Sequence, residues 1–141
     1  MADPVKPPTR VSLIWEGDLR FSSGDDEPAL VLDSDGKAGP SPMQAMGYAV
    51  MACMGMDIVH ILKKGRHPLE GLRCSMVGTR AENHPRRFMR IEMTFTVTGD
   101  VPRDATERAV QLSRETYCSA FNSMAHDIEW DFRVVSESMS Q

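Results

Sequence analysis

The chain has 141 residues, a length that suits one domain with its own core and leaves no room for a second. Its 20 acidic and 16 basic side chains give a formal net charge of −4, which argues against nucleic acid or an anionic membrane as the main partner. Hydrophobic residues make up 41% of the chain and charged residues 26%, as in ordinary soluble globular proteins.

The first forty residues predict a loose arm followed by three short strands. Residues 1–9 contain three prolines and no apolar run, so we expect a flexible arm and no signal peptide. Beyond it, clusters rich in glycine, serine and aspartate separate three short apolar stretches. These predicted strands cover residues 11–15, 19–21 and 29–33.

The stretch GPSPMQAMGYAVMACMGMDIVHILKKGRHP, residues 39–68, predicts one long helix over Pro42–Lys64. Ser41 suits the N-cap, and Gly65 can end the helix in the left-handed conformation. The helix would be about 35 Å long at about 1.5 Å per residue. Its apolar side chains wrap most of the circumference, so it must be buried nearly all round. A chain of this size struggles to cover such a helix alone, and we therefore expect a second subunit.

The same helix approaches the length that spans a membrane. Polar side chains interrupt it at Gln44, Asp57 and His60, and a charge in hydrocarbon is costly. The remaining elements are typical of a soluble protein, so we expect no membrane span.

The second half of the chain predicts two long strands, two helices and a last strand. Residues 69–81 and 88–98 alternate apolar and polar side chains, the pattern of half-buried strands that can pair as an antiparallel hairpin. A helix over residues 102–115, a break, a short helix over 120–125 and a strand over 128–135 follow. Residues 10–137 therefore predict a single α+β domain with the order βββ-α-ββ-α-β.

Cys53, Cys74 and Cys118 are the candidate reactive groups. Without an export signal they predict a reducing, cytoplasmic compartment, where a disulfide is more often transient and catalytic than structural. Cys53 lies within the long helix, and Cys118 lies at a helix break, where the positive end of the next helix can lower a thiol pKa. Only the fold can bring these two together, and a buried cysteine is often an inert hydrophobe. We interpret Cys74, on an apolar strand face, as inert core.

Other residues allow further interpretations. Cys53, Asp57 and His60 share one helix face and could bind zinc or iron, although no paired motif or fourth ligand accompanies them. Arg20, between two apolar residues of a short strand, is either a solvated side chain or a group that stabilises a thiolate. Methionines crowd the first part of the helix and either fill the core or line an apolar substrate site.

Two phrases resemble the OsmC/Ohr family of organic hydroperoxide reductases. They are GPSPMQAMGYAVMACMGMDIVHILKK and, far downstream, LSRETYCSA, and the order of elements agrees over residues 11–135. The resemblance implies an OsmC-like fold, an intertwined homodimer around paired central helices, and two active sites at the dimer interface.

The resemblance also implies a thiol peroxidase that needs no metal or other cofactor. Cys53 would attack the peroxide, Cys118 would resolve the sulfenic acid into a disulfide, and a dithiol of lipoyl or thioredoxin type would restore both thiols. Arg20 is the best match for the family arginine that activates thiol and peroxide. We assign substrate contacts to Met43, Gln44 and Met46, which begin an apolar wall favouring organic hydroperoxides.

The chain departs from the family pattern at one position. The family glutamate that holds the arginine lies ten residues before the helix cysteine, where this chain has Met43 and then Gln44. Methionine cannot pair with a guanidinium, and glutamine offers only a neutral hydrogen bond. Arg20 is therefore held by another acid or not at all, and peroxidase efficiency depends on which. The alternative function is a non-enzymatic dimer that binds a small ligand or partner in an apolar interface pocket.

Overall fold

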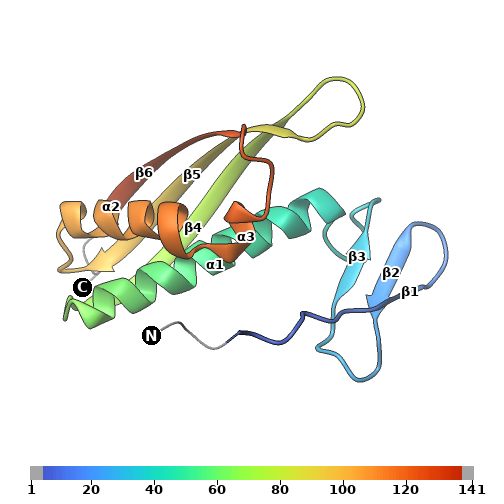
Figure 1. Ribbon diagram of the computed structural model, residues 1–141, viewed down its shortest axis with the longest axis horizontal. Coiled ribbons are helices and arrows are strands. Elements are labelled where there is room, and N and C mark those ends of the chain that lie inside the picture. The colour runs from blue at the N-terminus through green and yellow to red at the C-terminus, as the bar shows by residue number, and fades with distance from the viewer. Residues whose placement is uncertain (1–4, 138–141) are drawn as a thin grey trace. The chain divides into compact units, whose positions relative to one another are not determined.

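The computed structural model of the protein describes residues 5–137 and divides the chain into two compact units, up to Met46 and from Gly47 onward. The order of elements confirms the predicted α+β class (Figure 1). Residues 1–4 of the predicted arm lie outside the described residues, and residues 5–9 are exposed without helix or strand. A single domain over 10–137 stays a prediction.

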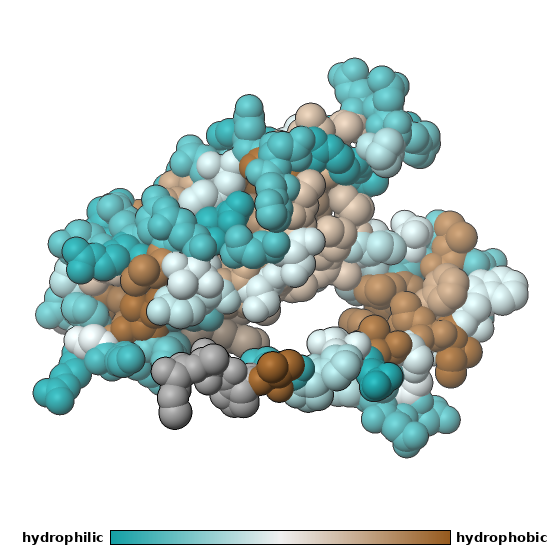
Figure 2. Space-filling model, in the orientation of Figure 1, coloured by the Kyte–Doolittle hydropathy of each residue, from teal (hydrophilic) through white to brown (hydrophobic). Residues whose placement is uncertain are grey.

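The first unit contains a small antiparallel sheet in the order β1-β2-β3. Its strands are β1 (Leu13–Trp15), β2 (Arg20–Ser23) and β3 (Val31–Asp33), so the first and third begin two residues later than predicted. The sheet and the turn between β1 and β2 leave large apolar side chains at least 39% exposed: Leu13, Ile14, Trp15, Leu19 and Phe21. Figure 2 shows hydrophobic residues, in brown, gathered on the surface of this unit. Burial of apolar side chains therefore contributes little to this sheet within one chain.

Helix α1 (Pro42–Lys64) has the predicted bounds. Ser41 and Gln44 form a reciprocal cap, because the Ser41 Oγ accepts from the Gln44 N–H at 3.2 Å and the Gln44 Oε1 accepts from the Ser41 N–H at 2.9 Å. At the other end Arg66, not Gly65 as predicted, adopts the left-handed conformation with a φ of 62°. The His67 N–H then donates to the Leu62 carbonyl at 3.0 Å, which closes the helix end as a Schellman motif.

The expected all-round burial of α1 is not met within one chain. One stripe is buried: Gly47, Val50, Met54, Ile58 and Leu62. Tyr48 is 60% exposed and Met56 is 71% exposed. By length and composition α1 could cross a membrane, a test that the core helix of a soluble protein also passes. A partner subunit that covered these exposed apolar side chains would explain why α1 carries them.

The second unit is built on a three-stranded sheet in the order β4-β5-β6. Its strands are β4 (Leu69–Arg80), β5 (Phe88–Gly99) and β6 (Glu129–Glu137). The predicted hairpin is confirmed, since β4 and β5 pair antiparallel, whereas β6 pairs with β5 in parallel. Figure 1 shows α1 and α2 on one side of this sheet. The core between them includes Ile91, Met93, Phe95 and Val97, all at most 2% exposed.

The parallel pairing of β5 and β6 requires a crossover, and the crossover carries Cys118. It consists of α2 (Arg103–Leu112), the π-helical turn η1 (Ser113–Tyr117) and the short helix α3 (Ser119–Asn122). The predicted single helix over 102–115 therefore ends early and continues as a π-turn, and the short helix is shifted toward the N-terminus. Cys118 lies at the break, where the sequence predicted it.

Candidate active site

Cys118 caps the N-terminus of α3 and is completely buried. Its Sγ accepts a hydrogen bond from the Phe121 N–H at 3.3 Å. Its own N–H donates to the Ser113 carbonyl at 2.7 Å, which closes the π-turn. The backbone of this segment thus fixes the thiol at the junction between η1 and α3.

Cys53 of α1 is half-buried and adjoins Cys118. Burial raises the pKa of Cys118 to about 11, the Phe121 N–H opposes this, and the hydrogen bond and charge of Cys53 raise it further. The expected lowering of this pKa by the helix end is therefore wrong in its net sign. A thiol with this pKa is protonated at neutral pH, so Cys118 is poorly suited to attack a substrate first.

Asp57, one turn after Cys53, faces the same segment. Its Oδ2 accepts a hydrogen bond from the buried Ser113 Oγ at 2.8 Å, and its charge contributes to the raised pKa of Cys118. Asp57 therefore makes this hydrogen bond within the chain. Among residues 5–137, Cys53, Asp57 and His60 do not form a group that could hold a metal ion.

Arg20 belongs to the first unit and the two thiols to the second, so its role at the thiols stays a prediction. Its Nη2 donates to the Glu16 carbonyl at 3.3 Å, and across the sheet it pairs with Asp33. The N–H of Asp35 is the main cause that lowers the pKa of Asp33, and the charge of Arg20 contributes. Asp33 is therefore the acid that the fold provides beside Arg20.

The predicted substrate contacts also lie in the first unit. The Gln44 side chain is occupied by the helix cap, Met43 is half-buried, and Met46 is 40% exposed. The thiol pair belongs to the other unit, so the contact of these three side chains with substrate stays a prediction.

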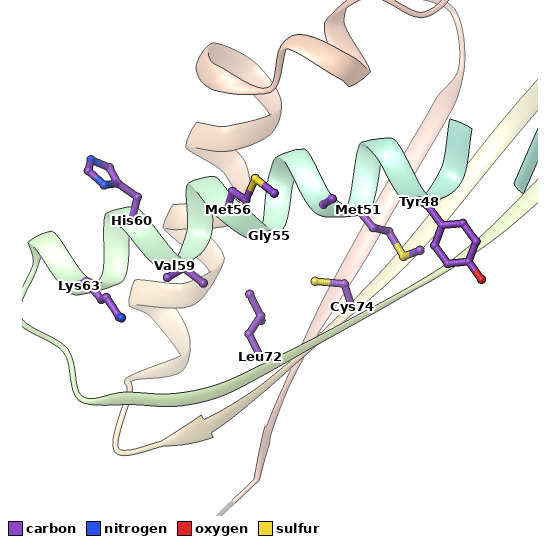
Figure 3. Close-up of a pocket in the computed structure, with 10 residues that line it drawn as sticks. Tyr48, Met51, Gly55, Met56, Val59, His60, Lys63, Leu72 and Cys74 are labelled. Atoms are coloured by element: carbon purple, nitrogen blue, oxygen red, sulfur yellow. The ribbon is translucent and has the colours of Figure 1, made fainter. Parts of the chain in front are cut away.

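The third thiol, Cys74, lies in a different environment. Cys74 of β4 is half-buried, and burial raises its pKa. Figure 3 shows Leu72 and Cys74 pointing toward α1, where they line an open apolar groove of about 710 Å³ with Met51, Gly55 and Val59. Cys74 is therefore the wall of a groove on the flank of α1, and not part of a closed core as predicted.

Sequence reasoning missed the residues that hold Cys118. Ser113, Arg114 and Asn122 all make hydrogen bonds within the segment, and the last two lie four residues before and after the cysteine. That spacing around a helix break is the signal that could have identified them.

Fold and site together define an α+β protein whose central helix and crossover each contribute one thiol to an adjacent pair. The chain belongs to the OsmC family, because the family model described as "OsmC-like protein" matches residues 34–133.

Known proteins resemble the chain in sequence, in fold or in both. Protein YhfA of Escherichia coli K12 is 37% identical over 108 residues, 74% of this chain and 81% of that protein. A hypothetical protein from Aquifex aeolicus has a TM-score of 0.86 and 26% identity, with 96% of this chain and all of the other covered. The organic hydroperoxide resistance protein OhrB of Bacillus subtilis has a TM-score of 0.59 and 17% identity, with 92% and 98% covered, and this likeness concerns the fold alone.

Proposed function

We propose that this protein is a thiol-dependent peroxidase that reduces organic hydroperoxides through Cys53 and Cys118. The observation that carries the proposal is the adjacency of the two thiols, which come from elements 65 positions apart in the sequence. Structural disulfides are rare in reducing compartments, so two adjacent free thiols favour a redox role there. Family membership and the fold shared with a hydroperoxide resistance protein support the same class of reaction.

The reaction divides into two steps on the protein. The Cys53 thiolate attacks the terminal oxygen of the hydroperoxide, the O–O bond breaks, and the alkoxide leaves as the alcohol after taking up a proton. Cys53 is then a sulfenic acid. The Cys118 sulfur, on losing its proton, attacks the Cys53 sulfur, so that an S–S bond forms and hydroxide leaves to become water.

An external dithiol then returns the enzyme to its starting state. One of its thiolates attacks the disulfide, its second thiol closes the exchange, and two electrons pass to Cys53 and Cys118. We propose a lipoyl or thioredoxin-type dithiol, which supplies both thiols in one molecule. The reducing cytoplasm is the compartment that we propose for this cycle.

Arg20 is the cation that we propose for activating Cys53 and the peroxide. With Met43 at the family glutamate position, Asp33 is our candidate for the acid that holds it, because the two are cross-strand partners. A guanidinium beside a thiolate stabilises the charged form and polarises the O–O bond through charge-assisted hydrogen bonds.

A homodimer is the assembly that we propose. Both the flank of α1 around Met56 and the apolar side chains of β1–β3 are bare in one chain. Exposed apolar surface on this scale is typical of protein interfaces. A second copy of the chain would cover these surfaces and give α1 the all-round burial that its composition predicts.

Peroxide consumption with a dithiol tests the peroxidase. With cumene hydroperoxide and dihydrolipoamide, we expect turnover in the wild type, none in Cys53→Ser, and accumulation of Cys53 sulfenic acid in Cys118→Ser. Cys74→Ser is the matched control, because it removes the one thiol that lies outside the pair, and it should retain turnover. Turnover unaffected by Cys53→Ser would exclude the mechanism.

Sedimentation tests the dimer. We expect Met56→Lys to weaken dimerisation by about a hundredfold, since a charge on an apolar interface loses its hydration. Met56 is 71% exposed in one chain, so the fold should tolerate the change. The exposed Glu107→Lys in α2 is the control for added charge. A wild-type monomer at all concentrations would exclude the dimer.

The open groove of about 710 Å³ supports the second candidate, a non-enzymatic protein that binds an apolar ligand or partner. Mass spectrometry of the protein after one equivalent of cumene hydroperoxide distinguishes the two functions. A Cys53–Cys118 disulfide supports the peroxidase, whereas unchanged thiols with a co-purifying apolar molecule support the binding protein.

A further inference from the structure

The segment around Cys118 contains more interactions than a helix cap requires. Asn122 uses both ends of its side-chain amide there. Its Nδ2 donates to the Cys118 carbonyl at 2.8 Å and to the Arg114 carbonyl at 3.0 Å. Its Oδ1 accepts from the Arg114 Nη1 at 3.2 Å. The amide therefore ties the residues before and after the break to one another.

Arg114 also contacts two aromatic side chains. Its guanidinium lies 3.9 Å from the centre of the Phe121 ring and 5.9 Å from that of Trp130. Phe121 is the residue whose N–H donates to the Cys118 Sγ. A cation stacked on an aromatic face restrains that ring, so Arg114 restrains the residue that provides the hydrogen-bond donor for the thiol.

The position of Arg114 is costly in one respect. Its Nε is buried and has no hydrogen-bond partner among the described residues. A buried donor without a partner is unfavourable, so the stacking on Phe121 and the bond to Asn122 must compensate for it.

We propose that Arg114 and Asn122 are positioning residues that hold the Cys118 thiol in reach of Cys53, a role that rests on the proposed peroxidase. Neither side chain touches the reacting sulfurs of the resolving step. They act through the Phe121 N–H and the Cys118 carbonyl, and so set how often the second thiol occupies the place from which it attacks.

The resolving step is the one that depends on this placement. The Cys118 thiolate attacks the Cys53 sulfur of the sulfenic acid, and its rate is proportional to the effective concentration of Cys118 there. A loosened turn lowers that concentration without changing Cys53 itself. The first step, attack of Cys53 on the peroxide, does not involve the turn.

The test separates the two steps in Arg114→Met and Asn122→Ala. After a pulse of cumene hydroperoxide, we expect Cys53 oxidation at the wild-type rate and disulfide formation at least tenfold slower. The fraction of Cys53 trapped by dimedone should rise accordingly. Arg114→Lys keeps the cation over Phe121 and should recover part of the rate. Arg108→Met, at an exposed arginine of α2, is the matched control and should leave both steps unchanged.

A second measurement does not depend on peroxide. In glutathione redox buffers, the Cys53–Cys118 disulfide of both variants should be at least tenfold less stable than in the wild type, about 30 mV in reduction potential. This shift, observed in a protein that does not reduce peroxide, would support positioning while the peroxidase fails. Equal dimedone trapping and equal disulfide stability in wild type and variants would overturn the proposal, as would equal slowing of both steps.

Discussion

The two flanks of α1 each face a cysteine from another element, and the two cysteines have different surroundings. On one flank, Cys53 and Asp57 face Cys118 and Ser113, and hydrogen bonds hold the contact. On the other, Gly55 lies close to the Cys74 sulfur, and both residues line the open apolar groove. Burial raises the pKa of both Cys118 and Cys74.

Burial therefore does not distinguish Cys118, the proposed redox thiol, from Cys74. What distinguishes Cys118 is a second thiol at its side, a backbone N–H on its sulfur and a carboxylate nearby. Cys74 has none of these as a cause of its pKa shift, which desolvation alone produces.

The largest effect should come from a substitution in the buried stripe of α1, which lies between the two flanks of that helix. Met54 is completely buried, and Met54→Ala should lower the free energy of unfolding by about 2–5 kcal/mol, because it leaves a cavity between α1 and the sheet. Urea denaturation measures the loss. Cys74 and Cys118 should both react faster with iodoacetamide, since both flanks share this support. A loss below about 1 kcal/mol would mean that the stripe repacks.

The next effect is a pH dependence that Cys118 gives to the reduced protein. Its native pKa of about 11 lies above the ordinary value of 9.0. Between these values the unfolded chain has released the proton that the folded chain retains, so stability falls as pH rises. The stabilisation is complete below about pH 9 and is lost as pH rises through about 11, about 3 kcal/mol in all.

Urea denaturation of wild type and Cys118→Ala at pH 8 and pH 11 measures this linkage. The difference in stability between the two proteins should shrink by about 2 kcal/mol across the range. Cys74→Ala, which removes the other thiol with a raised pKa, should show a smaller change in the same direction. A larger change for Cys74→Ala would reverse the comparison.

The smallest effect concerns the carboxylate. Asp57→Asn removes the charge that helps to raise the pKa of Cys118 and retains an oxygen for the Ser113 hydroxyl. We expect the pKa of Cys118 to fall and its alkylation at pH 8.5 to be about threefold faster. Mass spectrometry of the separate peptides should find Cys74 unchanged. Equal acceleration at both thiols would indicate loosening of α1 instead.

Much of this fold could be predicted because its signals are local. The bounds of α1 follow from Ser41 and the lysines of its last turn, and the strands β4 and β5 follow from strict alternation. The parallel pairing of β5 with β6 could not be predicted, since parallel and antiparallel strands alternate in the same way. Arg66 in place of Gly65 at the helix end also has no signature, because glycine was the expected residue there.

The candidate site was less accessible to sequence reasoning. Cys53 and Cys118 were paired through the family resemblance, and no spacing rule connects residues so far apart. The bond from Ser113 to Asp57 depends on where the crossover packs, which only the folded chain determines. The predicted direction of the Cys118 pKa shift was also wrong. The helix end lowers this pKa, but burial of the thiol raises it by more, and the sequence does not reveal how deeply the thiol is buried.

The π-helical turn η1 fixes Cys118 through the number of residues that it contains. A π-turn carries one residue more than an α-turn, and its closing bond runs from the Cys118 N–H to the Ser113 carbonyl, five residues earlier. Deleting one residue from Ser113–Tyr117 would convert the π-turn to an α-turn and remove this bond. A substitution can weaken the thiol pair, but a change in chain length would remove the turn that fixes its second sulfur.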